Sequence, residues 1–293
     1  MRRTQSVEID SRAETIAVDG RERSYTVVVP AAALSPDATL YLVLHGSNQT
    51  GAKVRAMAGE SFDAFAGSRD AVLVYPDAYK GLWHDARSSM SSPAKEAGVD
   101  DVAFLSALVQ KLGKRFGTSR VIGAGYSNGG QMIIRVIHEA PGLLTVAGII
   151  GATMPTPEVF DAKDSYQPLP VALFHGTRDP IVPYEGGMAS LWGMRPRGPG
   201  LSAPDTARYF AKRNGITAEP SIIHVPADTS RTSVPARRWV ETGHPSVTLY
   251  TVTDGGHTIP NPTKKALFIL GRTNRNISAA EKIWHTMPSA ANS

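Results

Sequence analysis

The chain has no cysteine among its 293 residues, and it contains no long, continuous apolar run. The lack of cysteine excludes disulfide frameworks, thiolate metal sites and a cysteine nucleophile. Since a transmembrane helix needs roughly 18 apolar residues in a row, we expect no membrane span. Residues 1–10 begin with basic side chains but hold no apolar core of a signal peptide. We therefore expect a cytoplasmic protein, although a secreted protein whose leader has been removed would show the same features.

Clustered charge is also scarce. Lys and Arg outnumber Asp and Glu by 31 to 26, but no basic block is interleaved with stacking aromatics, so we expect no nucleic-acid partner. The densest basic stretches, Arg195–Arg197 and Arg231–Arg238, are predicted to be solvated loops, with a site for anionic substrates as the alternative. No His, Asp or Glu cluster has metal-ligand spacing, so we expect no metal ion. The Gly123–Gly125 segment lacks the third glycine of a dinucleotide-binding loop, and we expect no organic cofactor.

What the sequence does contain is an alternation of apolar runs with helical patterns. Asp19–Gly20 between two β-rich runs predicts an antiparallel hairpin near the N-terminus. Continuous apolar runs predict buried strands, and apolar residues at helical spacing predict helices between them. The expected strands cover residues 39–44, 71–75, 120–123, 146–150, 169–174 and 247–252, and the expected helices lie near 60–68, 102–112, 132–137, 204–214 and 278–284.

These elements predict one α/β domain that covers residues 1–293. Strands that alternate with helices form a mostly parallel, doubly wound sheet, here preceded by the N-terminal antiparallel hairpin. The sequence shows no internal repeat and no low-complexity linker that would divide it. Residues 78–99 and 186–204 are expected to be long loops.

Gly125–Gly129 is a Gly-x-Ser-x-Gly pentapeptide between an apolar strand and an apolar helix. This context is typical of a nucleophile elbow, a tight turn that lifts the hydroxyl of Ser127 above the edge of a sheet. Glycine is expected at both ends of the pentapeptide because the backbone there passes so close to the neighbouring strand and helix that a Cβ would collide. The pentapeptide alone is a weak signal, since a glycine-rich turn without chemistry can also contain it.

A carboxylate and a histidine follow Ser127 at the ends of the last two predicted strands. They are Asp179 and His257. Because the carboxyl ends of parallel strands meet at one edge of a sheet, the three side chains are expected to converge. The order serine, aspartate, histidine is that of an α/β-hydrolase. We predict Ser127 as the nucleophile, His257 as its base and Asp179 as the acid that orients the imidazole, with Asp254 as the alternative acid.

The tetrahedral intermediate of such a reaction needs at least two hydrogen-bond donors for its oxyanion. The backbone N–H of Asn128, which follows the nucleophile, is predicted to be one donor. An N–H of the loop 45–47, with Ser47 as the candidate, is predicted to be the other. Trp83, His84 and Tyr126 are candidates for the substrate pocket, although an aromatic side chain more often belongs to the core.

Six ordered segments of the chain resemble the motifs of the poly(3-hydroxybutyrate) depolymerase family, which is related to the LpqC-like esterases and to the feruloyl and acetylxylan esterases. The segments are Leu44–Gly51, Trp83–Arg87, Val99–Leu105, Gly125–Gly130, His175–Gly187 and Gly255–Pro260. The resemblance covers residues 15–287 and implies an α/β-hydrolase fold with Ser127, Asp179 and His257 as a catalytic triad. Two departures are Ser47, where many relatives have cysteine, and His84, where many have asparagine.

The resemblance implies a serine carboxylesterase that acts on hydroxyacid esters, such as short 3-hydroxybutyrate oligomers. Attack on crystalline polymer is not expected, because the disulfides and the separate polymer-binding domain of the secreted depolymerases are missing from this sequence. A phenolic or acetyl ester of plant polysaccharide is the alternative substrate. A non-catalytic binding protein on the same scaffold is the alternative of another class.

Overall fold

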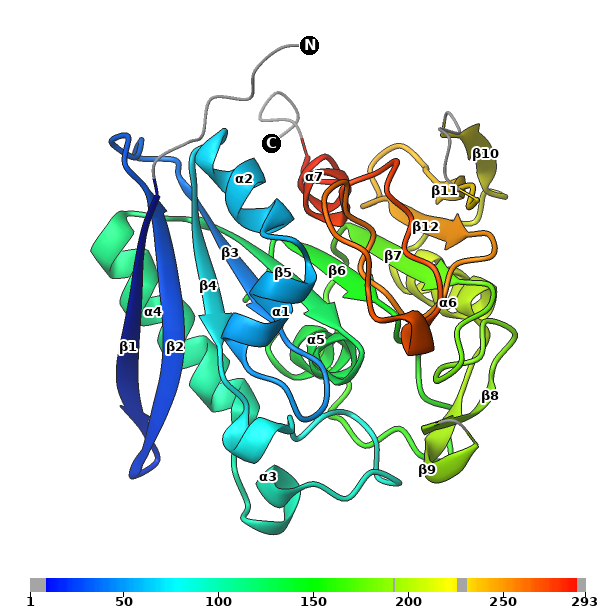
Figure 1. Cartoon of the computed structure of the whole chain (residues 1–293), viewed down its shortest axis with the longest axis horizontal. Helices are drawn as coiled ribbons and strands as arrows, with labels where there is room; N and C mark the ends of the chain where they lie inside the picture. The colour runs from blue at the N-terminus through cyan, green and yellow to red at the C-terminus, as the bar shows by residue number, and fades with distance from the viewer. Residues whose placement is uncertain (1–8, 192, 226–230, 289–293) are drawn as a thin grey trace.

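The computed structural model describes residues 9–191, 193–225 and 231–288, so the N-terminal segment 1–8 considered above lies outside the described residues. A ten-stranded sheet crosses the molecule (Figure 1). Its strands are β1 (Ile9–Val18), β2 (Arg21–Pro30), β3 (Thr39–Leu44), β4 (Ala71–Pro76), β5 (Arg120–Tyr126), β6 (Val146–Ile150), β7 (Val171–Gly176), β10 (Ser221–His224), β11 (Pro235–Trp239) and β12 (Val247–Val252). They lie in the order β1-β2-β4-β3-β5-β6-β7-β12-β11-β10.

The predicted N-terminal hairpin is confirmed and forms one edge of this sheet. β1 and β2 pair antiparallel from Ile9↔Pro30 to Val18↔Arg21. Between them, Asp19 has φ 50° and Gly20 has φ 72°. Two consecutive residues at positive φ make a turn whose twist matches that of the flanking strands, and Asp-Gly is the favoured pair for it.

The middle of the sheet is parallel, as predicted. β4, β3, β5, β6, β7 and β12 are six neighbouring strands that pair parallel. Every residue of β3, β4, β6 and β7 is buried, which explains why these strands read as continuous apolar runs. The carboxyl ends of β3, β5, β7 and β12 therefore share one edge, where the predicted site residues follow.

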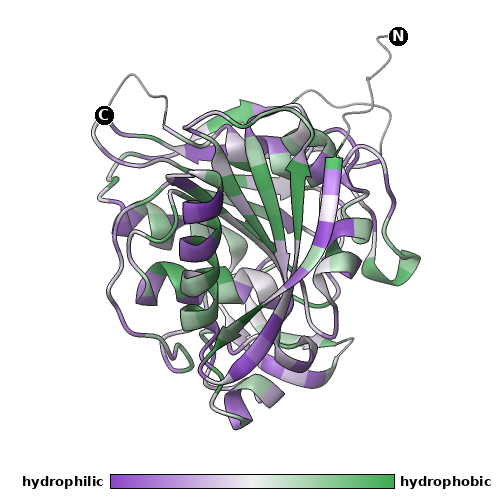
Figure 2. Ribbon diagram, turned by 90° about the vertical axis from the view of Figure 1, so that its left-hand side faces the viewer, coloured by the Kyte–Doolittle hydropathy of each residue, from purple (hydrophilic) through white to green (hydrophobic). Residues whose placement is uncertain are grey.

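Helices cover both faces of the sheet. The helices α1 (Gly51–Met57), α2 (Ser61–Gly67) and α7 (Ala279–Trp284) pack on the face seen in Figure 1. The opposite face carries α4 (Asp101–Phe116), α5 (Asn128–Glu139) and α6 (Ala203–Arg213). Figure 2 shows hydrophobic residues concentrated in the central strands and polar residues along the edge strand nearest the viewer. This two-layered cover makes the sheet a doubly wound α/β structure.

Local capping explains two of the helix ends that the sequence predicts. Asp100 caps α4 because its side chain accepts a hydrogen bond of 2.8 Å from the N–H of Ala103. Ser278 caps α7 by accepting a hydrogen bond from the N–H of Glu281. The neighbouring acid Asp101 has another role, since it forms a buried ion pair of 2.7 Å with Arg23.

The predicted loops contain more regular structure than expected. Residues 186–204 include an antiparallel pair outside the main sheet, β8 (Gly187–Leu191) and β9 (Met194–Gly200), at the lower right of Figure 1. Residues 78–99 include the short helices η1 (Tyr79–Gly81) and α3 (Pro93–Glu96), and the stretch Arg231–Arg238 contributes to β11. The glycines and prolines of β9 argue against a central strand, but a two-stranded ribbon tolerates them because each strand has one unpaired edge.

Within the described ranges, no helix is both long enough and apolar enough to cross a membrane.

Candidate active site

Ser127 occupies a strained turn between β5 and α5. Its backbone has φ 54° and ψ −116°, a region that residues with a side chain rarely adopt. The turn is held because the Ser127 N–H donates to Ile150 O at 2.8 Å, and the Ser127 carbonyl accepts from the N–H of Gln131 at 3.0 Å. A strained serine at the carboxyl end of a strand is the geometry of a nucleophile elbow.

The two glycines of the pentapeptide are required by close backbone contacts, as the sequence predicts. A Cβ on Gly125 would lie 2.1 Å from the carbonyl oxygen of Gly129, and a Cβ on Gly129 would lie 2.4 Å from that of Leu44. Both distances are far below van der Waals contact. Strand β5, the start of α5 and the end of β3 can therefore approach one another only with glycine at these positions.

Asp179 and His257 form a buried, hydrogen-bonded pair. Nδ1 of His257 donates to Oδ2 of Asp179 at 2.7 Å, while Oδ1 accepts from the N–H groups of Ile181 and Val182, both at 2.8 Å. Burial alone would raise the pKa of Asp179, but the charge and hydrogen bond of His257, with further help from His175, hold that pKa below its ordinary value. The carboxylate thus stays ionised and fixes the imidazole with its other nitrogen, Nε2, free for chemistry.

The alternative acid, Asp254, does not reach His257. Its Oδ1 lies 2.7 Å from Nε of Arg178, in a partly exposed ion pair, and its N–H donates to Oγ1 of Thr177. Asp254 therefore shapes the loop that leads to His257, and Asp179 is the carboxylate bonded to the histidine.

His257 is packed against the residue that precedes Ser127. The hydroxyl of Tyr126 donates to the carbonyl of His257 at 2.9 Å, and the two rings lie 5.0 Å apart between centroids. Among the described residues, the Ser127 hydroxyl has no hydrogen-bond partner, so its bond to His257 stays a prediction. Such bonds often close only in the substrate complex.

Two further buried histidines have structural roles. Nδ1 of His45 donates to Gly46 O at 2.7 Å, and its Nε2 accepts from the N–H of Ala78 at 3.0 Å. Nε2 of His175 donates to Val182 O at 2.9 Å. Burial lowers the pKa of both rings. Each ring thus braces a loop at the carboxyl ends of the strands.

The two predicted oxyanion donors lie in suitable segments. Among the described residues, neither the N–H of Asn128 at the first turn of α5 nor the N–H of Ser47 has an acceptor. The N–H of Gly46, by contrast, donates to Oε1 of Gln49 at 3.1 Å. Helix N-termini leave N–H groups unpaired, so Asn128 and Ser47 remain our predicted pair.

The Asn128 side chain has a role that the sequence did not reveal. Its Oδ1 accepts from the N–H of Trp83 at 2.9 Å, and its Nδ2 donates to Oδ2 of Asp85 at 2.6 Å. Asp85 in turn binds Arg87 through two contacts, Nε–Oδ1 at 3.0 Å and Nη2–Oδ2 at 2.5 Å. This chain ties the segment 83–87 to the elbow. The signal in the sequence was the acid and the base two residues apart in the Trp83–Arg87 motif, but a linear pattern does not show what they bind.

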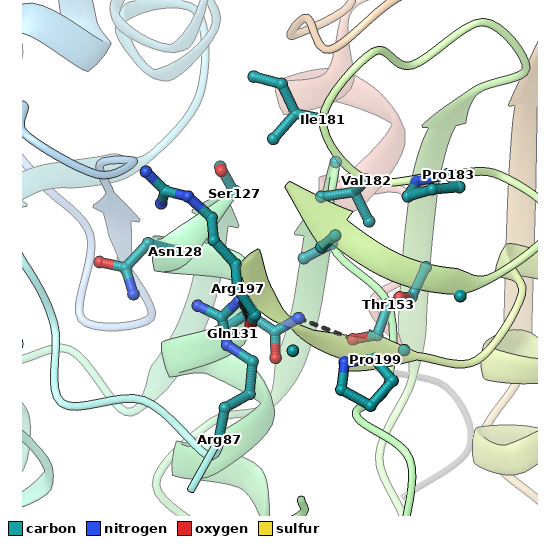
Figure 3. Close-up of a pocket in the computed structure, with 16 residues that line it drawn as sticks. Arg87, Ser127, Asn128, Gln131, Thr153, Ile181, Val182, Pro183, Arg197 and Pro199 are labelled. Atoms are coloured by element: carbon teal, nitrogen blue, oxygen red, sulfur yellow. Dashed lines mark hydrogen bonds between the residues drawn. The ribbon is translucent and has the colours of Figure 1, made fainter. Parts of the chain in front are cut away.

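A narrow cavity, open to solvent, adjoins Ser127. Figure 3 shows its lining side chains. They come from the elbow, from the segment after β6, from the turn after Asp179 and from the β8–β9 ribbon. The lining residues that matter below are Gln131, Thr153, Ile181, Val182, Pro183 and Arg197.

The predicted pocket residues lie elsewhere. Trp83 is fully buried and donates from Nε1 to His45 O at 2.9 Å. Tyr126 faces His257, as described above, and Nδ1 of His84 lies 3.0 Å from Val99 O. None of the three lines this cavity, so their place in a substrate pocket stays a prediction. The aromatic rings pack beneath the loops of the site, as aromatic side chains commonly do in protein cores.

Within the described part of the chain, no group of three or more His, Asp or Glu side chains is arranged to hold a metal ion.

Comparisons with known proteins agree with this geometry. Residues 69–191 match the phospholipase/carboxylesterase family. The chain is 27% identical over 288 residues to the "Putative esterase NocK" of Nocardia uniformis subsp. tsuyamanensis, covering 92% of this chain and 80% of that protein. It is 26% identical over 203 residues to a bifunctional acetylxylan esterase/xylanase of Neocallimastix patriciarum, covering 68% of this chain and 28% of that protein.

Among solved structures, the acetyl xylan esterase from Aspergillus awamori superposes with a TM-score of 0.60 at 16% identity, over 85% of this chain and 95% of that one. At this identity the likeness concerns the fold. The mostly parallel sheet with its N-terminal antiparallel hairpin is thus an α/β-hydrolase fold, as predicted. Together, this fold and the esterase relatives support a carboxylic ester hydrolase of the α/β-hydrolase type.

Proposed function

We propose that the chain is a serine carboxylesterase that hydrolyses short hydroxyacid esters, such as 3-hydroxybutyrate oligomers, through an acyl-enzyme. The observation that carries the serine mechanism is the buried Asp179–His257 pair at the same sheet edge as the strained Ser127. The hydroxyacid substrate is supported by the resemblance of the six motifs to poly(3-hydroxybutyrate) depolymerases and LpqC-like esterases, and by the lining of the cavity.

In the first half of the reaction, Oγ of Ser127 attacks the ester carbonyl carbon while Nε2 of His257 takes its proton. The N–H groups of Asn128 and Ser47 stabilise the oxyanion, each by about 3 kcal/mol. The imidazolium then returns the proton to the leaving alcohol as the C–O bond breaks. Water repeats these steps on the acyl-enzyme and releases the acid, while Asp179 keeps the proton on Nδ1 throughout.

The cavity combines apolar walls with a free hydrogen-bond acceptor. Ile181, Val182 and Pro183 supply apolar surface on one side. On the other, Nε2 of Gln131 donates to Thr153 O at 2.8 Å, drawn as a dashed line in Figure 3. Oε1 of Gln131 is buried and, among the described residues, has no donor. A short acyl chain with one methyl and one hydroxyl group would meet both needs, because its hydroxyl could donate to Oε1.

Acetyl esters of plant polysaccharide are the second candidate substrate. The observation that favours them is the similarity to the bifunctional acetylxylan esterase/xylanase, which covers 68% of this chain. An acetyl group is smaller than a hydroxybutyryl group and would leave Oε1 of Gln131 without a donor from the acyl chain.

The mechanism is tested by labelling with a fluorophosphonate probe. Wild-type protein should label at Ser127, and Ser127→Ala should lose both labelling and ester hydrolysis while its circular dichroism stays unchanged. Labelling that survives the substitution would show that another residue is the nucleophile. Absence of labelling in the wild type would instead favour a non-catalytic binding protein on this fold.

The substrate class is tested by comparing rates on a 3-hydroxybutyrate dimer, 4-nitrophenyl acetate, 4-nitrophenyl butyrate and methyl ferulate. We expect the highest kcat/KM, after correction for leaving-group reactivity, on the hydroxybutyrate dimer. A higher corrected value on the acetyl or feruloyl ester would overturn the hydroxyacid assignment and leave the serine mechanism standing.

A further inference from the structure

Arg197 extends from the β8–β9 ribbon into the cavity beside the nucleophile. It lines the cavity together with Ser127, and Figure 3 shows its side chain reaching toward that serine. Its Nη1 donates to Oγ of Ser47 at 2.5 Å, in the loop of the predicted oxyanion site. The guanidinium is therefore placed beside the nucleophile and beside the predicted oxyanion site.

The charge of Arg197 has no acidic partner. Within the described ranges, no Asp or Glu oxygen lies within ion-pair distance of its guanidinium, whereas Arg87 pairs with Asp85. The acid whose charge acts on Arg197, Asp85, already binds Arg87 by two contacts and Asn128 by a third. Arg87 is thereby neutralised, whereas Arg197 is a cation in a partly buried site without a counter-charge.

This arrangement is costly for the free protein. Burial, and the neighbouring guanidinium of Arg87, lower the pKa of Arg197 below its ordinary value. Nε of Arg197 is buried and, among the described residues, has no acceptor. A buried donor without an acceptor and a cation without an anion both destabilise the folded state. A ligand that brought an anionic acceptor would relieve both.

Contacts of the backbone around Arg197 fix the position of its side chain. Nη1 of Arg87 donates to the carbonyl of Arg197 at 3.0 Å. The next residue, Gly198, packs so tightly on Ser89 that a Cβ there would lie 2.0 Å from its Oγ. These two contacts fix strand β9 over the segment 85–89, so Arg197 points into the cavity from a supported ribbon.

We propose that Arg197 is a carboxylate-binding residue, and that the preferred ester substrate carries a carboxylate a few bonds from the scissile ester. An arginine fork suits a carboxylate because it can donate two parallel hydrogen bonds. The free acid end of a hydroxyacid dimer offers such a group on its leaving alcohol, and a monoester of a short dicarboxylic acid offers one on its acyl part. This proposal deepens the function proposed above and rests on its serine mechanism.

The test uses two pairs of esters that differ only in a carboxylate and its neutral carboxamide. The first pair is the 3-hydroxybutyrate dimer and its terminal carboxamide, which places the charge on the leaving alcohol. The second pair is monomethyl succinate and the methyl ester of succinamic acid, which places it on the acyl part. For each pair, the ratio of kcat/KM between acid and amide is measured in the wild type and in Arg197→Gln.

We expect the wild type to prefer the acid in at least one pair, and Arg197→Gln to reduce that preference about 10- to 100-fold, the usual loss for a charge-assisted hydrogen bond. The loss should appear mainly in KM, and the preference should weaken as salt is added. Arg195→Gln is the matched control, because Arg195 lies on the same strand with an exposed side chain, and it should leave the preference unchanged.

Two results would overturn the proposal. A wild type with no preference for the acid in either pair shows that no carboxylate is recognised. An equal loss on acid and amide in Arg197→Gln shows that Arg197 acts only by positioning Ser47. If neither the acids nor the amides are hydrolysed and the fluorophosphonate does not label, the proposed esterase function itself fails, which is a different outcome from either of these.

Discussion

The carboxylate of Asp179 uses its two oxygens for different purposes. Oδ1 accepts the N–H groups of Ile181 and Val182, which closes the turn after β7, and Oδ2 holds Nδ1 of His257. One residue therefore links the local turn to the histidine that follows β12. A turn-starting aspartate and a catalytic aspartate look alike in the sequence, and here the same side chain closes a turn and holds a histidine.

Replacement of Asp179 by asparagine should separate these two purposes. The amide oxygen can keep the turn, but the amide nitrogen faces Nδ1 of His257 and forces the wrong tautomer. We expect kcat on 4-nitrophenyl butyrate to fall by about 10⁴-fold, with the thermal unfolding midpoint within a few degrees of the wild type.

Asp254→Asn is the control for this substitution, since Asp254 pairs with Arg178. It should retain most of the activity. A large loss in Asp254→Asn together with an active Asp179→Asn would contradict the assignment of the acid.

At the scale of secondary-structure elements, the site depends on how closely helix α5 approaches strand β3. The start of α5 lies against the end of β3, so that the first turn of the helix presents the N–H of Asn128 beside the loop 45–47. Gly129 is the point of contact, because a Cβ there would lie 2.4 Å from the carbonyl of Leu44. The contact is between the backbones of α5 and β3, so no flexible side chain can move aside to make room for a Cβ.

Gly129→Ala should therefore push α5 away from β3. We expect a loss of roughly 1–3 kcal/mol in the free energy of unfolding, as for other overpacked sites, and a fall in kcat because Ser127 moves with the helix. Urea unfolding and hydrolysis of 4-nitrophenyl butyrate measure the two effects.

The matched control is Gly113→Ala in α4, where the added Cβ would lie 3.4 Å from its nearest neighbour, Thr118 O. Alanine is the better helix former by about 0.5–1 kcal/mol, so this variant should be as stable as the wild type or more so. A Gly129→Ala protein with wild-type stability and activity would show that α5 can shift without cost.

The elements also show what a linear sequence can predict. The buried strands β3, β4, β6 and β7 were found because sheets covered on both faces need continuous apolar runs. The β8–β9 ribbon was missed because its pairing depends on contacts with the segment 85–89 and not on apolar periodicity. Arg197 was recognised only as part of a basic stretch, since its orientation into the cavity follows from that ribbon.

At the scale of the whole molecule, the chain order of the catalytic candidates was predictable and their surroundings were not. Ser127, Asp179 and His257 follow three strands of one parallel sheet, so topology alone brings them to one edge. For Trp83, His84 and Tyr126 the opposite holds. Their positions depend on how two loops fold back under the site, which no periodicity encodes.

The whole molecule should also respond to acid through its buried histidines. His45 and His138 are fully buried, and burial lowers the pKa of each below its ordinary value of 6.5. Each accepts a hydrogen bond on Nε2, His45 from the N–H of Ala78 and His138 from the hydroxyl of Tyr209. Both rings are therefore neutral in the folded state, and protonation would remove these bonds.

Their contribution to stability is present above pH 6.5 and is lost as the pH falls, because only the unfolded chain binds the protons there. We expect the free energy of unfolding to decrease below pH 6.5, by up to about 1.4 kcal/mol per pH unit for each histidine. Urea unfolding at pH 7.5, 6.0 and 5.0 measures this slope. His138→Gln should reduce the slope by up to one proton. Equal slopes in the wild type and in His138→Gln would show that His138 is not held neutral by burial.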